Sequence, residues 1–230
     1  MSEKLLILGT KGMAKVAIDA VEEMNIYSEI ALLDNYPDQS HLFSYPIIGK
    51  CDDLEHFVAD YSHAFVSIAD NKVRMSYMQR LLTAGYEVPN IISPHAYVSD
   101  KAVLGTGILV NVHAVIQPDS RLGNGCIINT GAIVEHDNEL GEYVNISPNA
   151  TTTGYVKIGS YTFLGASSCI INNVVIGEGV LVAAGAVVIA DVPDNVMVAG
   201  CPATIKKTIK EVKYKKKLSY NIDNAGKPGV

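Results

Sequence analysis

The sequence contains no tryptophan, few aromatic residues and few charges. Aromatic residues make up 7% of the 230 positions, charged residues make up 18%, and the formal net charge is −6. Because 48% of the residues are hydrophobic, the chain is neither disordered nor a basic nucleic-acid-binding domain. No apolar run reaches the roughly 18 residues of a membrane helix, and the N-terminal MSEKLLILG is too short for a secretory signal. We expect a cytoplasmic protein with no membrane span and no nucleic-acid partner.

The chain also lacks closely spaced cysteines. The four cysteines are Cys51, Cys126, Cys169 and Cys201. Structural zinc sites need cysteine pairs such as CxxC, so we expect reduced thiols and no metal, and we interpret Cys126 and Cys169 as packing residues. A catalytic zinc of the carbonic anhydrase kind needs three convergent histidines. His95, His113 and His136 are spaced by 18 and 23 residues with no close pair, which disfavours that alternative.

An aliphatic residue recurs at every sixth position from Ile92 to Val188. Only Thr152 breaks the series, and the residue four positions after each aliphatic is usually small or β-branched. An amphipathic helix would show a period near 3.6, and an antiparallel sheet would show a period of two interrupted by turns. A period of six is typical of a parallel β-helix in which each hexad forms one flat side, and we assign it residues 92–205.

Glycines recur within this region at a period of eighteen. They are Gly105, Gly123, Gly141, Gly159 and Gly177. Three hexads therefore form one triangular coil, and the glycines predict a turn that needs positive φ. A purely structural solenoid, such as an ice-binding protein, is the alternative. Ice binding needs a repeated threonine array, and the repeat holds a single threonine cluster at 151–153.

Residues 1–91 show strands that alternate with helices. We expect strands at 4–8, 30–33, 64–68 and 88–92, and helices at 13–24 and 72–84. This alternation predicts a small Rossmann-like α/β domain with a parallel sheet. Ligands of such sheets bind beyond the carboxyl ends of the strands.

Polar and glycine residues follow three of these strands. They are the Gly9–Gly12 turn, Asp34-Asn35 and Ala69-Asp70. The turn reads GxxG, and it places backbone N–H groups and a helix N-terminus where a diphosphate could bind. Asp34 lies where an acidic side chain can meet a ribose or a base. The alternative is a structural turn. A nicotinamide enzyme is disfavoured, because the glycine fingerprint is incomplete and no substrate domain remains.

His136 differs from the other histidines because Glu135 and Asp137 flank it. Either carboxylate could fix the imidazole tautomer and raise its basicity. Gly154 lies eighteen residues later, in the adjacent coil, and Thr152 lies in that same coil. A missing side chain and a polar residue beside a histidine predict a cleft. A neutral imidazole there is suited to accept the proton of an attacking amine.

The whole chain resembles the hexapeptide-repeat sugar acetyltransferases. The segments that carry this resemblance are LILGTKGMAK, LLDN, SIADNKVR, INTGAIVEHDNELGEYVNISPNA and VAGCPA. That family includes the bacillosamine-pathway and perosamine N-acetyltransferases, which act on nucleotide sugars, and the sialic acid O-acetyltransferase. The resemblance implies a left-handed β-helix, a homotrimer and acetyl-CoA as co-substrate. It also implies a nucleotide sugar held by the N-terminal domain and chemistry between neighbouring prisms.

The resemblance assigns roles residue by residue. His136 is implied as the general base and Asp137 as the residue that orients it. The implied acetyl-CoA contacts are Asn145, Gly154, Ala166 and Ala184, and Asn145 stands where the family often has a second histidine. The implied nucleotide-sugar contacts are Gly9, Thr10, Lys11, Gly12, Met13, Asp34, Asn35, Ala69 and Asp70. The family commonly has glycine or serine at position 11, histidine at 13 and glycine at 69.

We therefore predict acetyl-CoA-dependent N-acetylation of a nucleotide-linked amino sugar, a 4-amino-4,6-dideoxyhexose. The product would enter a bacterial surface glycan such as lipopolysaccharide O-antigen. O-acetylation of a sialic acid is the alternative. The nucleotide base and the sugar stereochemistry stay open. Residues 206–230 form a basic tail, which we interpret either as a solvated amphipathic helix or as a region that attracts CoA phosphates.

Overall fold

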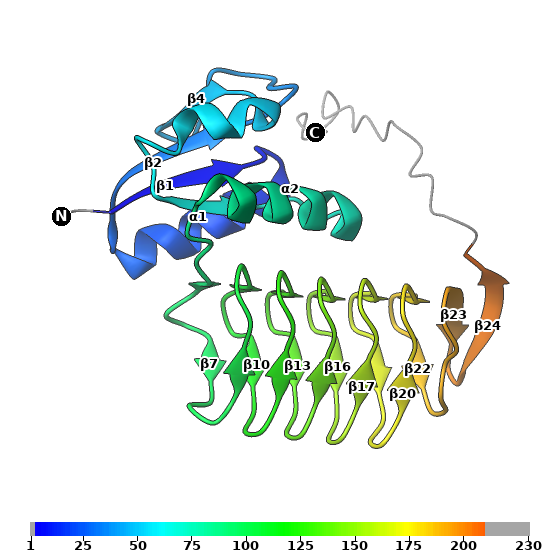
Figure 1. The fold of residues 1–230 in the computed structure, drawn as a ribbon. Coiled ribbons are helices and arrows are strands. Elements are labelled where there is room, and N and C mark those ends of the chain that lie inside the picture. Colours follow the sequence, from blue (N-terminus) through cyan, green and yellow to red (C-terminus); the bar gives the residue numbers. More distant parts are fainter. Residues whose placement is uncertain (1–2, 210–230) are drawn as a thin grey trace, which may run out of the picture.

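The computed structural model describes residues 3–209 of the chain. The N-terminal part, from Glu3 to Ala84, forms a sheet with two helices, and the strands from Ile91 onward form a triangular prism that lies beside it (Figure 1). Lys206 and Lys207, the first lysines of the predicted basic tail, lie in strand β24 (Ala203–Thr208) and not in a helix. This strand pairs antiparallel with β23 (Val196–Gly200). The remainder of the tail lies outside the described residues.

The N-terminal sheet is covered on both faces. Strand β1 (Glu3–Leu8) lies between β2 (Tyr27–Leu33) and β5 (His63–Val66), and all three are parallel. Alternate residues of β1 enter two separate cores. Leu5 and Ile7 pack with helix α1 (Gly12–Met24), whereas Leu6 and Leu8 pack with helix α2 (Asn71–Ala84). The uninterrupted apolar run of β1 is therefore that of a parallel strand buried on both sides.

Three elements of this domain are absent from the sequence-based prediction. They are β3 (His41–Leu42), β4 (Tyr45–Gly49) and the 3₁₀ segment η1 (Cys51–Phe57). The sheet order is β3-β4-β2-β1-β5, so β4 extends the sheet beside β2. Pro46 lies in β4, and proline is tolerated towards the edge of a sheet but weakens the strand signal in the sequence.

The prediction that residues 88–92 complete the N-terminal sheet is wrong. Within this segment, Ile91–Ile92 forms β6, which pairs with β9 (Leu109–Val110) in the prism. Pro89 interrupts the segment, and Asn90 fixes the crossing to the prism. The Asn90 side chain donates to Gly105 O at 2.8 Å and accepts from Ile108 N at 2.9 Å.

The prism has three flat faces built mainly of two-residue parallel strands. The β6 face contains β6, β9, β12 (Ile127–Ile128), β15 (Asn145–Ile146), β18 (Phe163–Leu164), β21 (Leu181–Val182), β23 and β24. The β7 face contains β7 (Tyr97–Val98), β10 (Val115–Ile116), β13 (Ile133–Val134), β16 (Thr151–Thr152), β19 (Cys169–Ile170) and β22 (Val187–Val188). The β8 face contains β8 (Val103–Leu104), β11 (Arg121–Leu122), β14 (Glu139–Leu140), β17 (Lys157–Ile158) and β20 (Val175–Ile176).

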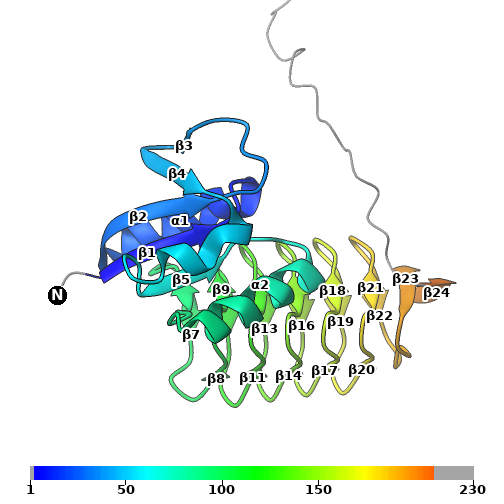
Figure 2. The same cartoon turned by 45° about the horizontal axis from the view of Figure 1, so that its top comes forward.

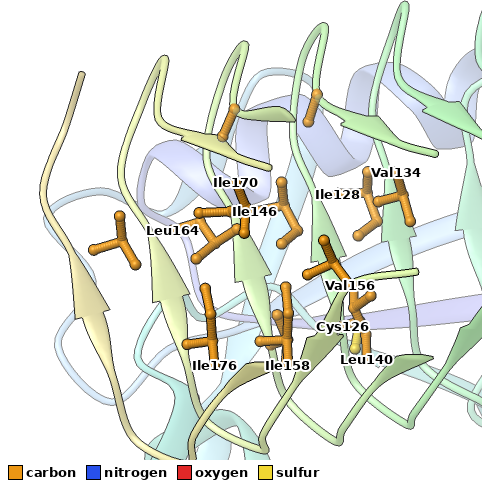
Figure 3. Packing of buried hydrophobic residues seen from close by; sticks show 14 of the residues in the cluster. Cys126, Ile128, Val134, Leu140, Ile146, Val156, Ile158, Leu164, Ile170 and Ile176 are labelled. Atoms are coloured by element: carbon orange, nitrogen blue, oxygen red, sulfur yellow. The ribbon is translucent and has the colours of Figure 1, made fainter. Parts of the chain in front are cut away.

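The register between successive coils is eighteen residues, as the sequence predicts. Val134, for example, pairs with Thr152, and Thr152 pairs with Ile170. The second residue of each two-residue strand points into the prism, where the aliphatic side chains form one continuous core (Figure 3). Thr152 is fully buried in this column, and its hydroxyl lies 3.4 Å from Ile133 O. Cys126 is also in the core, and burial raises the pKa of its thiol to about 12, so it is a packing residue.

The glycines spaced by eighteen have a different physical cause from the predicted one. None of the five has positive φ. A Cβ on Gly123 would lie 2.7 Å from the Gly141 carbonyl carbon, and one on Gly159 would lie 2.5 Å from Glu178 N. The column is glycine because successive coils stack too closely for a side chain. The positive φ falls two residues later, for example at Gly125, Tyr143 and Tyr161.

Three edges connect the faces, and we name each by the faces that it joins. The β6–β7 edge includes residues 111–114, the β7–β8 edge includes 135–138, and the β8–β6 edge includes 141–144. The Rossmann-like domain covers the β6 face, where Leu109 and Ile127 join the core around α1 (Figure 2). Among residues 3–209, no helix has the length and apolar character needed to cross a membrane.

Candidate active site

His136 and Asp137 form a hydrogen-bonded pair on the β7–β8 edge. His136 Nδ1 lies 2.8 Å from Asp137 Oδ2, and the two side chains are 49% and 38% exposed. In the neutral imidazole, Nδ1–H donates to the carboxylate and Nε2 keeps its lone pair. Asp137 adopts φ 58°, a left-handed conformation that aspartate tolerates. The pair therefore presents a proton acceptor at a half-exposed position.

The space left by the missing side chain of Gly154 is occupied by the imidazole ring of His136. A Cβ on Gly154 would lie 2.5 Å from His136 Cε1 and 2.8 Å from Nε2. Tyr155 flanks the ring edge-on, with 5.3 Å between centroids. The expectation of an open cleft at Gly154 is therefore wrong. The missing side chain allows the imidazole to lie flat against the next coil.

A hollow of about 430 Å³ lies beside Asp137, on the β8 side of this edge. It is lined by Asp119, Arg121, Asp137, Glu139, Tyr155 and Lys157. Lys157 and Glu139 form an ion pair of 3.0 Å across adjacent strands. Within residues 3–209, no group of three or more His, Cys, Asp or Glu side chains is arranged to hold a metal ion.

The residues that the resemblance assigns to acetyl-CoA lie in three places. Gly154 is buried on the β7–β8 edge under His136. Ala166 and Ala184 are exposed, one coil apart, on the β6–β7 edge. Asn145 is 2% exposed on the β6 face, and its Oδ1 has no hydrogen-bond partner among the residues that the structure describes. One chain thus places Gly154 and the two alanines on the two edges that flank the β7 face, and Asn145 on the β6 face.

The turn after β1 leads directly into an open helix end. Gly9 adopts φ 99°, a conformation that favours glycine, and Gly9 N donates to Leu33 O at 2.8 Å. Among residues 3–209, no side chain caps α1, and a Cβ on Gly12 would meet nothing within 4 Å. Lys11 is exposed and forms an ion pair with Asp38, whereas Met13 packs against the α1 core. This helix N-terminus is therefore available to an anion.

The polar residues after β2 are tied into the loop. Asp34 accepts from the Thr10 hydroxyl and, at 2.8 Å, from Tyr36 N. Both ends of the Asn35 amide are also engaged. Its Nδ2 donates to the Tyr77 hydroxyl at 2.9 Å, and its Oδ1 accepts from Asp52 N at 3.1 Å. Asn35 therefore holds the loop against α2, while Asp34 links the β2 end to the glycine turn.

The loop after β5 is anchored by a residue that sequence reasoning missed. Asp70 caps α2, because its Oδ1 accepts from Lys72 N and Val73 N at 3.0 Å. The Ala69 and Ile68 carbonyls accept from Arg74 Nη1 at 3.1 and 3.0 Å. Arg74 ends the SIADNKVR segment that carries the family resemblance, but nothing in the sequence marks its side chain as buried.

Arg74 also ties the Rossmann-like domain to the prism. Its Nε donates to Gly125 O at 2.8 Å, and its Nη2 donates to Tyr143 O at 3.2 Å and to Asn71 Oδ1 at 2.9 Å. The side chain is 1% exposed, and burial lowers its pKa to about 10. The guanidinium therefore stays charged at neutral pH, with its N–H groups bonded to neutral oxygens.

The nucleotide-binding candidates and the histidine lie on different sides of the prism. The former gather at the carboxyl ends of β1, β2 and β5, in the domain that covers the β6 face. This domain also contacts the two edges that flank the β6 face. Arg74 binds Gly125 O on the β8–β6 edge, and the Ser93 hydroxyl on the β6–β7 edge donates to Glu23 Oε2 at 3.3 Å. His136 lies on the third edge. A single chain therefore does not bring the nucleotide-binding candidates and His136 together.

Two family descriptions match separate parts of the chain. The PglD N-terminal domain matches residues 4–81, and the bacterial transferase hexapeptide (six repeats) matches residues 155–190. No curated protein matches the chain by sequence.

Solved structures match nearly the full length. A variant of perosamine N-acetyltransferase from Caulobacter crescentus, in complex with CoA and GDP-perosamine, is 34% identical with a TM-score of 0.86. The match covers 90% of this chain and 98% of that one. The acetyltransferase domain of PglB from Neisseria gonorrhoeae FA1090, in complex with acetyl coenzyme A, is 33% identical (TM-score 0.87, 90% and 100% covered).

WeeI from Acinetobacter baumannii AYE is 25% identical, with a TM-score of 0.82 and coverage of 89% and 100%. These likenesses confirm the predicted fold class, a Rossmann-like domain followed by a left-handed parallel β-helix. The chain therefore belongs to the hexapeptide-repeat sugar acetyltransferases that carry a PglD-type N-terminal domain.

Proposed function

We propose that this enzyme transfers an acetyl group from acetyl-CoA to the amine of a nucleotide-linked sugar, a 4-amino-4,6-dideoxyhexose. The observation that carries the proposal is the His136–Asp137 pair, which leaves Nε2 free on a half-exposed edge. The likeness to an N-acetyltransferase in complex with CoA and GDP-perosamine supports the substrate class. The open N-terminus of α1 supports a diphosphate group in the substrate.

The chemistry is a direct transfer with His136 as general base. The sugar amine attacks the thioester carbonyl carbon, the C–S bond breaks, and CoA leaves as the thiolate. His136 Nε2 takes the proton of the amine, and the leaving sulfur is the final proton acceptor. Asp137 holds Nδ1–H and stabilises the imidazolium. Asn145, Gly154, Ala166 and Ala184 contact acetyl-CoA in this proposal, and the residues at the three strand ends contact the nucleotide sugar.

The proposal includes a homotrimer, in which two chains form each site. The outward residues of the β7 face carry no charge, and all except Tyr97 are half-buried already in the single chain. The outward residues of the β8 face are all exposed and include Arg121, Glu139 and Lys157. A ring formed through the β7 face would place the His136 edge of one chain against the Ala166 edge of the next.

The proposed setting is the cytoplasm, where nucleotide sugars and acetyl-CoA are available. An acetylated 4-amino-4,6-dideoxyhexose would serve a bacterial surface glycan such as lipopolysaccharide O-antigen. This part of the proposal depends on the substrate and is tested with it.

The test is a panel of UDP-, dTDP- and GDP-linked amino sugars with acetyl-CoA, with release of the CoA thiol as the signal. We expect turnover with a 4-amino-4,6-dideoxy sugar nucleotide and none with the corresponding free sugar. Titration calorimetry with UDP, dTDP and GDP alone identifies the base that the free protein binds. Turnover of free sialic acid, with no heat from any nucleotide, would reject the N-acetyltransferase proposal.

A further inference from the structure

In each hexad, the residue four positions after the aliphatic residue points into the prism. At one turn of one edge, this residue is an asparagine. Along the β7–β8 edge this position is occupied by Ser120, Asn138, Val156 and Val174 in successive coils. Asn138 is fully buried. It lies in the same turn as His136 and Asp137, so its side chain points into the prism beneath the proposed base.

The imidazole of His136 lies in a slot between two backbone segments, and the Asn138 amide nitrogen forms hydrogen bonds to both of them. It donates to Glu135 O at 2.6 Å and lies 3.2 Å from His136 O, within its own turn. It also donates to Thr153 O at 2.9 Å, in the residue before Gly154. The first wall of the slot is therefore the backbone that carries His136, and the second is the backbone that ends at Gly154.

The clearance in this slot is small. A Cβ on Gly154 would lie 2.5 Å from His136 Cε1, so the ring rests directly on the next coil. His136 O also accepts from Tyr155 N at 3.2 Å, and Asp137 N donates to Pro118 O at 3.1 Å. A shift of either backbone would change where Nε2 points, because the ring has no room to compensate.

The fold itself does not require an amide at this position. Val156 and Val174 fill it in the next two coils of the same edge, and both are buried. Asn138 also leaves its Oδ1 buried with no hydrogen-bond partner in the described part of the chain, which lowers stability relative to an apolar side chain. A costly polar group occupies the one turn that carries the His136–Asp137 pair.

We propose that Asn138 is a positioning residue for His136. Its amide locks the turn 135–138 to Thr153 and thereby fixes the direction of Nε2 toward the acceptor amine. This inference rests on the proposed function, in which His136 is the general base. Asn138 itself touches no substrate.

The main test is Asn138→Val, because valine already fills the equivalent position at Val156 and Val174. In the folded variant we expect kcat to fall about tenfold, since small misplacements of a catalytic group are costly. KM for acetyl-CoA and for the sugar nucleotide should stay within about twofold. A kcat within twofold of wild type would overturn the proposal.

The matched control is Thr162→Val, at the same inward position on the β8–β6 edge. The Thr162 hydroxyl donates to Gly177 O at 2.8 Å and accepts from Val180 N at 3.0 Å. This change also removes buried hydrogen bonds, so Tm should fall, but kcat should stay at the wild-type value. An equal loss of kcat in both variants would show a general effect of stability and would overturn the positioning role.

Asn138→Ser provides a second variant if valine prevents folding. Ser120 occupies the same position one coil earlier and donates to Glu135 O at 2.8 Å, fifteen residues on. Serine at 138 should likewise reach Thr153 O but not its own turn, so we expect an intermediate kcat. Wild-type kcat in Asn138→Ser would overturn the proposal. His136→Ala separates the two hypotheses, because full activity there rejects the proposed base whatever Asn138 does.

Discussion

The two edges that flank the β8 face differ in what covers them. At the β8–β6 edge, Arg74 binds Gly125 O and Tyr143 O, and the Tyr143 and Tyr161 rings stack at 5.7 Å. At the β7–β8 edge, His136 and Asp137 are partly exposed to solvent. The first edge is fixed by its own chain, whereas the second is left open.

This difference shows how the chain separates two tasks. Buried hydrogen bonds hold the substrate-binding candidates in register with the prism, because a shifted domain would misplace any bound sugar. The proposed base is held within its own edge, by Asp137, by contact with Gly154 and by the turn backbone that Asn138 binds. In our account, a second chain completes the site at the open edge.

The largest expected effect comes from a charge on the β7 face. Ile133→Glu places a carboxylate at the centre of the uncharged face that we propose as the interface. Burial of an unpaired charge costs several kcal/mol, so we expect a monomer in sedimentation and no measurable turnover. Val175→Glu on the exposed β8 face is the control, with assembly and activity retained. A trimeric, active Ile133→Glu would place the interface elsewhere.

At the β8–β6 edge, Arg74→Met should lower the free energy of unfolding by about 3 kcal/mol, because several buried carbonyls lose their donor. Urea denaturation measures this change. Arg80→Met on the same helix breaks solvent-accessible contacts with Glu55 and Asp52, so its effect should be below about 1 kcal/mol. Equal effects of the two substitutions would contradict the description of Arg74 as the anchor of this edge.

At the β7–β8 edge, His136→Ala should lower kcat about 10²-fold or more, the usual scale for a general base. KM for acetyl-CoA should change little, because the imidazole acts on the acceptor. Asp137→Asn should have a smaller effect, since it orients the base and does not replace it. Steady-state kinetics measures both. Near-wild-type turnover of His136→Ala would reject His136 as the general base and make His113 the next residue to test.

The smallest expected effect lies in the nucleotide turn. Asp34→Ala removes the carboxylate that joins the β2 end to the Thr10 hydroxyl. We expect nucleotide binding to weaken by about 1–3 kcal/mol, with acetyl-CoA binding unchanged. Calorimetry with each ligand measures this. Asp38→Ala, which breaks the exposed pair with Lys11, is the control and should change nucleotide binding by less than about 1 kcal/mol.

The prism could be predicted from sequence because its rule is local. Each hexad buries one aliphatic residue, so the register of eighteen follows from counting, and His136, Asp137 and Gly154 fall on the same edge. The cause of the glycine column could not be read in this way. It depends on the distance between coils, which a periodic pattern does not contain.

Long-range contacts explain what the sequence did not reveal. Arg74 bonds to carbonyls 51 and 69 residues away, and no local pattern marks a helical arginine as buried. Strand β4 is not evident from the sequence because Pro46, its second residue, weakens the strand signal. Asn138 did carry a signal, because it is an amide in a column of small and β-branched residues, and its meaning emerged only with its three carbonyl partners.

The central claim is that two chains complete each site, and mixed trimers test it most directly. His136→Ala removes the base. Gly12→Glu places a carboxylate at the open N-terminus of α1, where a Cβ meets nothing within 4 Å, so it should repel a diphosphate without disturbing the fold. Each variant alone should be trimeric and inactive.

Co-expressed with different tags and purified as mixed trimers, the two variants should recover about a third of wild-type activity, because one site in each ring of three pairs an intact turn with a neighbour's intact His136. Mixed trimers with no activity above that of the separate variants would show that each site lies within one chain. That result would contradict the account.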